Sequence, residues 1–205
     1  GTALIIMFSG LIILWIAQIP RWFFVMLAFG VLFGAPTLYK TLKPYQKQRI
    51  QALLGYGDSK KERYQVEQSK IAIGSGGMWG KGLMRGTQNR FSFLPEARTD
   101  FIFSVLCEEW GFAGALLVLL LFSLLFIRLI FISLQIPRLL EQLAAIGLLA
   151  PIMLSTIINI GMVTGMLPTV GIPLPLFTYG ITHLWITLAS LGVLNNIAIR
   201  RFWYY

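Results

Sequence analysis

The sequence predicts an all-α membrane protein, a polytopic bundle of about five transmembrane helices with one large extracellular loop. Hydrophobic residues make up 57% of the 205 residues and the mean hydropathy is +0.74. This share exceeds the roughly 45–50% that is typical of a soluble domain. Five apolar stretches, four of them without charged residues, also have lengths near or above the roughly 17–25 residues that cross a bilayer. Together these features predict a single membrane domain over residues 1–205.

The five predicted helices cover residues 2–19, 22–39, 101–132, 143–163 and 176–199. The first two form a helical hairpin, because only the tight turn at Pro20 separates them. The third is too long for one crossing unless its first turns, around Glu108 and Glu109, lie at or above the membrane interface. The chain lacks an initiator Met and a charged segment ahead of its first apolar stretch, so we expect the C-terminal part of a longer protein.

Arginines in the short connections predict the orientation. One side carries Arg21, Arg128, Arg138, Arg200 and Arg201, whereas the short loop 164–175 has no charge. Because basic residues in short loops mark the cytoplasmic side, we expect the arginine side and the C-terminus in the cytoplasm. Residues 40–99 then form the extracellular loop, although they hold the other 12 of the 17 basic residues. A loop of this length is typically functional or disordered, and its apolar residues favour function.

The net charge and the counts of cysteine and histidine exclude several classes of function. The net charge of +9 in so apolar a chain indicates anionic lipid headgroups or a phosphorylated substrate rather than nucleic acid. Cys107 and His183 are the single cysteine and the single histidine. A disulfide, a multi-thiolate metal site and a His-rich zinc site are therefore excluded within this chain.

Two loops have unusual backbone composition. The segment GSGGMWGKGLMRG, residues 74–86, holds six glycines. It is either a tight turn or a phosphate-binding loop whose amides act together with Lys81 or Arg85. In residues 165–180, three prolines exclude a regular helix. Either this loop is partly buried and lines a cavity, or it is an exposed turn between helices.

Acidic residues in and beside the third stretch are the candidate site. Asp100 precedes the apolar run, where it either stabilises the start of a helix or presents a fixed carboxylate outward. On an ideal helix Glu108 and Glu109 lie roughly 12–13 Å below it, about 80° and 180° around the axis. We expect Glu108 to point to a cavity and Glu109 to pair with a basic group or an amide. Other polar residues in the spans, which we expect to bond neighbouring helices, are Asn159, His183, Asn195 and Asn196.

Four motifs in order resemble the SEDS proteins of bacteria, the RodA and FtsW type. They are LKPYQKQRI (42–50), YQVEQSKIAIGSGGMWGKG (64–82), GTQNRFSFLPEARTDFIFSVLCEEWGFAG (86–114) and GMLPTVGIPLPLFTYG (165–180). The match covers nearly the whole chain. The resemblance implies the second half of a ten-helix fold in the bacterial cytoplasmic membrane, with residues 40–99 as the extracellular loop.

The resemblance also implies an activity, polymerisation of lipid II into glycan strands by a peptidoglycan glycosyltransferase. Asp100 of the TDFIF motif corresponds to the essential aspartate of the family, as general base or as ligand of a divalent cation (Mg or Mn). The implied partners are lipid II, the growing strand and a class B penicillin-binding protein. Residues expected to bind substrate are Lys43, Arg49, Lys81, Arg85, Glu96, Thr99 and Glu108.

The chain departs from the family pattern at two places. Ile181, Thr182 and His183 replace the usual glycine and serine after Tyr179–Gly180, and Cys107 replaces a glycine before the two glutamates. Ile181 adds bulk that is expected to alter the cavity near the last helix. Two alternatives to the polymerase are a flippase for the lipid-linked precursor and a non-catalytic membrane partner of a cell-wall synthase.

Overall fold

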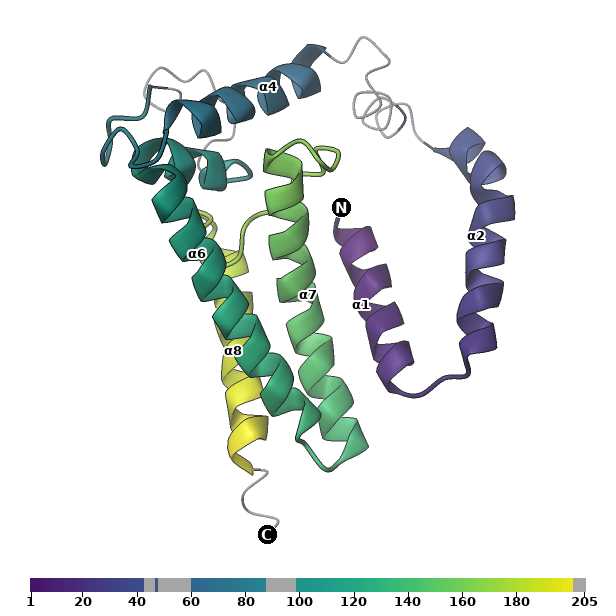
Figure 1. Ribbon diagram of the computed structural model, residues 1–205. Helices are drawn as coiled ribbons and strands as arrows, with labels where there is room; N and C mark the ends of the chain where they lie inside the picture. Colours follow the sequence, from purple (N-terminus) through teal and green to yellow (C-terminus); the bar gives the residue numbers. More distant parts are fainter. Residues whose placement is uncertain (43–46, 48–59, 88–98, 201–205) are drawn as a thin grey trace.

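The computed structural model describes residues 1–42, 47, 60–87 and 99–200, and all regular structure within them is helical (Figure 1). Helices α6, α7 and α8 lie side by side, α1 packs against α7, and α4 lies across one end of this bundle. The helix bounds are α1 Thr2–Ile16, α2 Arg21–Thr41, α4 Lys60–Ser75, α6 Ile102–Leu134, α7 Leu139–Val163 and α8 Ile181–Arg200.

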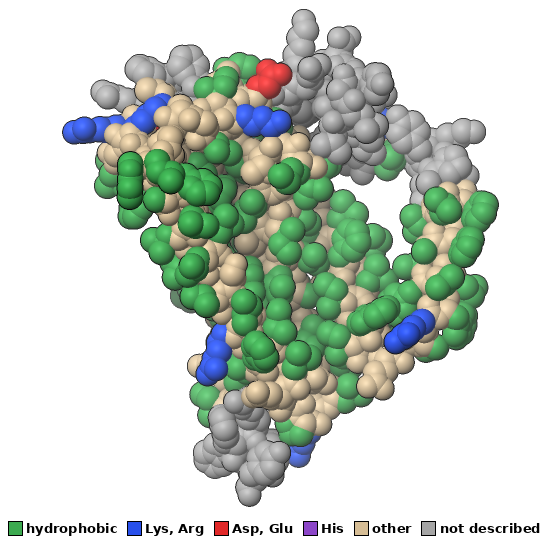
Figure 2. Space-filling model, viewed as in Figure 1, with side chains coloured by type: hydrophobic (Ala, Val, Ile, Leu, Met, Phe, Trp, Pro, Cys, Tyr) green, Lys and Arg blue, Asp and Glu red, His purple; other side chains and the backbone are tan. Residues whose placement is uncertain are grey.

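Three of these helices are long and apolar enough to cross a membrane: α6, α7 and residues Ile181–Ile199 of α8. The apolar helices Thr2–Ile16 and Arg21–Gly34 are shorter. Hydrophobic side chains cover the flanks of the helices, and Lys and Arg side chains gather towards the two ends (Figure 2). This distribution is that of a multi-pass membrane protein.

The hairpin of α1 and α2 agrees with the predicted tight turn. Helix α1 ends at Ile16 with Ala17 as its C-cap, and Gln18 turns the chain with a φ of 59° before Pro20. Helix α2 then stands apart from the other helices (Figure 1). Its described apolar side chains, such as Leu32 and Phe33, are therefore exposed.

The core lies between α6, α7 and α8. Phe122 of α6, Leu149 of α7 and Leu194 of α8 are buried members of one hydrophobic cluster. Helix α8 begins at Ile181, five residues later than the start predicted at position 176, because the proline-rich loop extends through residues 176–180.

Helix α4 is a structured part of the segment predicted to be the extracellular loop. The Ser69 hydroxyl lies 2.7 Å from the Ser104 hydroxyl of α6 and donates a hydrogen bond of 2.7 Å to the carbonyl of Val163 in α7. Ser69, Ala72 and Ser104 are fully buried. One serine thus joins three helices at this end of the bundle.

Candidate functional site

Asp100 lies in the turn that leads into α6, at the same end of the bundle as α4. The N-cap of α6 is Phe101, and its first turn contains no acidic residue. Asp100 therefore lies one residue before the N-cap, and a role of its carboxylate in stabilising the start of the helix stays a prediction. The carboxylate is half-buried beside the proline-rich loop 164–180.

Asn159 of α7 holds the backbone at Asp100. Its side-chain amide is fully buried and donates to the carbonyl of Asp100 at 2.8 Å and to the carbonyl of Ile172 at 2.7 Å. Thr178 adds a hydrogen bond of 3.1 Å to the carbonyl of Thr99. Two loops that are distant in sequence are thereby fixed to each other. Asn159 was predicted to bond to a neighbouring helix, but it bonds instead to the turn at Asp100 and to the loop at Ile172.

The loop 164–180 enters the bundle instead of crossing its surface. Ile172 is 2% exposed and Leu174 is fully buried, and the ring of Phe177 lies 5.9 Å from that of Phe122 in α6. Gly171 has a φ of 68°, and a Cβ there would lie 3.3 Å from a carboxylate oxygen of Asp100. The prediction of a partly buried loop is confirmed, and glycine lets its backbone pass close to Asp100.

The glycine-rich segment docks on a break in α6. Gly111 has a φ of 67° and a ψ of −166°, which interrupts the helix after Trp110. At this break Lys81 N–H donates to the carbonyl of Glu108 at 3.0 Å and Gly82 N–H to the carbonyl of Glu109 at 3.0 Å. In the other direction, Phe112 and Ala113 N–H groups donate to the carbonyls of Gly77 and Met78 at 2.9 and 3.1 Å.

These bonds bear on the two interpretations of this segment. The amides of Lys81 and Gly82 are bound to α6, and the Gly80 amide donates to Gly76 at 2.8 Å. These three amides are not available to an anion. The segment forms a docked turn, and phosphate contact by its other groups stays a prediction. A Cβ on Gly80 would collide with the carbonyl of Glu109, which explains the need for glycine at this close approach.

Glu108 is the buried acid of this junction. Its side chain is fully buried, and one oxygen lies 2.7 Å from the Lys81 ammonium. The same oxygen accepts from the amide and the hydroxyl of Thr87 at 2.7 and 2.8 Å. The Lys81 ammonium also contacts the hydroxyls of Ser75 and Thr87 at 2.8 and 3.0 Å. Glu108 therefore fastens the turn to α6, and its three bonds offset the cost of burying a carboxylate.

The expected roles of the two glutamates are thus reversed. Glu108 was expected to face a cavity, yet it pairs with Lys81. Glu109 was expected to pair, yet its side chain lines a pocket and has no hydrogen-bond or ion-pair partner within the described residues. The three donors of Lys81 are all used, so this residue holds the turn rather than presenting a free cation.

Other residues singled out from the sequence also lie within the described part of the chain. Arg85 is exposed on the docked turn and Thr99 is half-buried beside Asp100. His183 lies on α8, where its backbone carbonyl accepts from Thr187. Ile181, at the start of α8, is 71% exposed within the described residues, and its effect on a cavity stays a prediction. Lys43, Arg49 and Glu96 lie outside the described residues.

The described residues contain no group of three or more His, Cys, Asp or Glu side chains that could hold a metal ion. Asp100 is therefore the single predicted metal ligand among them. A cation at this carboxylate would need most of its ligands from substrate or water.

Fold and site together define a multi-pass helical membrane protein with a carboxylate held between two loops at one end of its bundle. A family model described as "Cell cycle protein", covering FtsW, RodA and SpoVE, matches residues 1–202. The chain belongs to this family.

Similar proteins include the peptidoglycan glycosyltransferase MrdB of Escherichia coli K12, 41% identical over 98% of this chain and 55% of the relative. The stage V sporulation protein E of Bacillus subtilis is 44% identical over 76% of this chain and 42% of the relative. The chain thus spans about half the length of the curated relatives it matches.

Solved structures are also similar. A structure described as "Structural coordination of polymerization and crosslinking by a peptidoglycan synthase complex" has a TM-score of 0.78 and 33% identity. The match covers 98% of this chain and 56% of that one. A mutant of the Rod shape determining protein RodA of Thermus thermophilus has a TM-score of 0.50 and 36% identity over 65% of this chain and 40% of that one.

Proposed function

We propose that the full-length protein is a peptidoglycan glycosyltransferase that polymerises lipid II, with Asp100 as the catalytic carboxylate. The observation that carries this proposal is the fixed position of Asp100, whose backbone is bound by Asn159 and whose side chain adjoins Gly171. A general base must be held in a narrow range of positions to act on one hydroxyl. The names of the relatives supply the substrate class.

In the proposed reaction the 4-hydroxyl of one lipid-linked sugar attacks the anomeric carbon of the growing chain. A new glycosidic C–O bond forms, the bond to the diphosphate breaks, and the hydroxyl proton passes to the Asp100 carboxylate. The polyprenyl diphosphate leaves with the electron pair of the broken bond. A divalent cation such as Mg²⁺ or Mn²⁺ could supply charge neutralisation for this leaving group, with Asp100 as its protein ligand.

The exposed Arg85 is the described basic residue best suited to the diphosphate, since a guanidinium binds two phosphate oxygens at once. Lys43 and Arg49 stay predicted contacts of the same kind. Glu96 and Thr99 stay predicted substrate contacts through their place in the motif around Asp100. Lys81 and Glu108 support this surface by holding the turn that carries Arg85.

The proposed setting is the bacterial cytoplasmic membrane, with this chain as the second half of a ten-helix fold and its C-terminus in the cytoplasm. The end that carries α4 and Asp100 then faces outward, where the lipid-linked precursor is polymerised. A class B penicillin-binding protein is the proposed partner, supported by the similar structure of a complex that couples polymerisation to crosslinking.

Replacing Asp100 by Asn in the full-length protein tests the proposal. The amide keeps the shape of the side chain but cannot accept the proton, so we expect polymer formation from lipid II to fall by about 10²-fold or more. Glu67→Gln is the matched control, because Glu67 is an exposed acid on α4. Polymerisation at the wild-type rate in the Asp100→Asn protein would refute the assignment. Headgroup translocation without polymer in vesicles would instead favour the flippase.

A further inference from the structure

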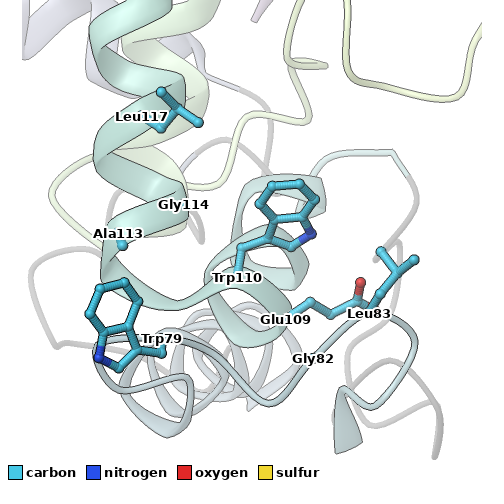
Figure 3. A pocket seen from close by; sticks show the side chains of 8 residues that line it. All are labelled: Trp79, Gly82, Leu83, Glu109, Trp110, Ala113, Gly114 and Leu117. Atoms are coloured by element: carbon cyan, nitrogen blue, oxygen red, sulfur yellow. The ribbon is translucent and has the colours of Figure 1, made fainter.

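A pocket opens beside the break in α6, on the flank of the bundle. Its volume is about 400 Å³, and its lining combines Trp79 and Leu83 of the docked turn with Glu109, Trp110 and Leu117 of α6. Figure 3 shows Trp79 next to Ala113 at the start of the straight part of α6, with Trp110 and Glu109 on the turn before it. The pocket lies within the size range of small-ligand sites.

The pocket suits a cationic group. Glu109 is partly buried among apolar side chains, and within the described residues no donor neutralises its carboxylate. An ion pair is the usual compensation for a carboxylate that has lost part of its water. The indole ring of Trp110, which lies beside Glu109 (Figure 3), also favours a cation, because a cation is attracted to the face of tryptophan.

A positive side chain stands at the edge of the same pocket. Gly82 lines it, and a Cβ on Gly82 would lie 3.5 Å from Cδ of Arg85. The Arg85 side chain is exposed and has no partner among the residues described. A ligand that carries a positive and a negative group a few ångströms apart would therefore find a partner for each.

The surroundings of the pocket are apolar and exposed within the described residues. On the turn, Trp79 is 82% and Met84 is 81% exposed, and such apolar side chains next to Arg85 are typical of the membrane interface. Below the pocket, the surface of α6 continues with the exposed Leu117, Leu120 and Leu121. An acyl chain lying against these leucines would stay in contact with the protein as it leaves the pocket.

We propose that this pocket binds the headgroup of a zwitterionic aminophospholipid from the surrounding bilayer. Its ammonium group pairs with Glu109 beside the ring of Trp110, its phosphate binds Arg85, and one acyl chain follows Leu117. The site does not include Asp100, and it shares Arg85 with the diphosphate contact of the proposed function. It would fix the depth of the docked turn in the membrane.

The full-length protein in nanodiscs of phosphatidylethanolamine and phosphatidylglycerol, without lipid-linked precursor, tests this site. Lipids that stay bound after delipidation are counted by mass spectrometry. We expect the wild type to retain phosphatidylethanolamine preferentially and Glu109→Gln to lose this preference by roughly tenfold. Glu67→Gln, on the exposed face of α4, should leave it unchanged. Arg85→Gln should lower retention of both lipids, since both carry the phosphate.

Two outcomes would overturn the proposal: a wild type without preference for phosphatidylethanolamine, or a Glu109→Gln protein with the wild-type preference. If Glu109→Gln does not fold, Trp110→Ala decides, because that side chain is 54% exposed and lies beside Glu109, so its loss should still weaken the preference. The Asp100→Asn protein should keep wild-type lipid binding. A failure of the proposed enzyme function is thereby distinguished from a failure of the lipid site.

Discussion

Replacing Asn159 by leucine is expected to release Asp100 from its fixed position. The Asn159 amide is the single side chain that binds the carbonyls of both Asp100 and Ile172 among the described residues, at 2.8 and 2.7 Å. Leucine has a similar volume but no donor. The change therefore removes both hydrogen bonds without opening a large cavity.

The loss of stability should be modest. Interhelical hydrogen bonds in membrane proteins contribute about 0.6 kcal/mol on average and at most about 1.7 kcal/mol each. Two such bonds give about 1–3 kcal/mol. The variant also removes the buried Asn159 carbonyl oxygen, which has no partner among the described residues, and this partly offsets the loss. We expect a net destabilisation of about 1–2 kcal/mol.

The loss of activity should be larger. A displacement of a catalytic group by about 1 Å can lower the rate by about 10²-fold. We therefore expect the Asn159→Leu protein to stay folded at assay temperature, with lipid II polymerisation reduced by about 10–10²-fold. Thermal unfolding in detergent and the initial polymerisation rate measure the two effects on the same sample.

Asn195→Leu is the matched control, because Asn195 is exposed on α8. It should change neither quantity. If Asn159→Leu polymerises lipid II at the wild-type rate, Asn159 does not position Asp100. If activity falls only in proportion to the unfolded fraction, the contribution of Asn159 is to stability alone.

Two further predictions concern the docked turn. Glu108→Gln leaves the Lys81 ammonium without its carboxylate and should destabilise the protein by about 3 kcal/mol. The double change Glu108→Leu with Lys81→Met should destabilise it by less than the sum of the two single changes. If denaturant unfolding shows that the two losses of stability are additive, the pairing of these residues is contradicted. Alanine at position 111 would have to adopt the positive φ of Gly111, and its Cβ would lie 2.7 Å from the Met78 carbonyl. We therefore expect Gly111→Ala to lower the free energy of unfolding by about 2 kcal/mol or more. Gly192 has open space around it, so Gly192→Ala should leave the stability unchanged or raise it. Equal effects of the two alanines on the unfolding temperature would contradict the strain at Gly111.

The sequence was most informative where hydrophobicity dominates. The apolar runs predicted α6 and α7 to within four residues at each end, because a long apolar run with few charges has few alternatives to a spanning helix. The prolines likewise predicted the partly buried loop before α8. Helix α4 was missed, since its charged side chains hide the buried Ser69 and Ala72. The mean hydropathy of such a helix does not reveal it, because only one narrow face packs on the other helices.

The roles of Glu108 and Glu109 could not be predicted from helical spacing. An ideal helix gives the angle between two side chains but not the identity of the segment that packs on each side. Here the docked turn covers Glu108 with Lys81 and Thr87, and the break at Gly111 leaves Glu109 beside a pocket. A glycine inside an apolar run was the available signal, and it is ambiguous because many membrane helices contain glycine without a break.

The part of α6 from Ile102 to Trp110 connects the features of this end of the molecule. Asp100 precedes it, Ser104 binds α4 on its side, and Glu108 holds the docked turn near its end. Gly111 separates this segment from the long apolar part of α6. A change in the bilayer that moves the docked turn would therefore act on a short rigid helix that begins beside the Asp100 carboxylate, rather than on the whole bundle. This short helix therefore links the docked turn to the proposed catalytic carboxylate.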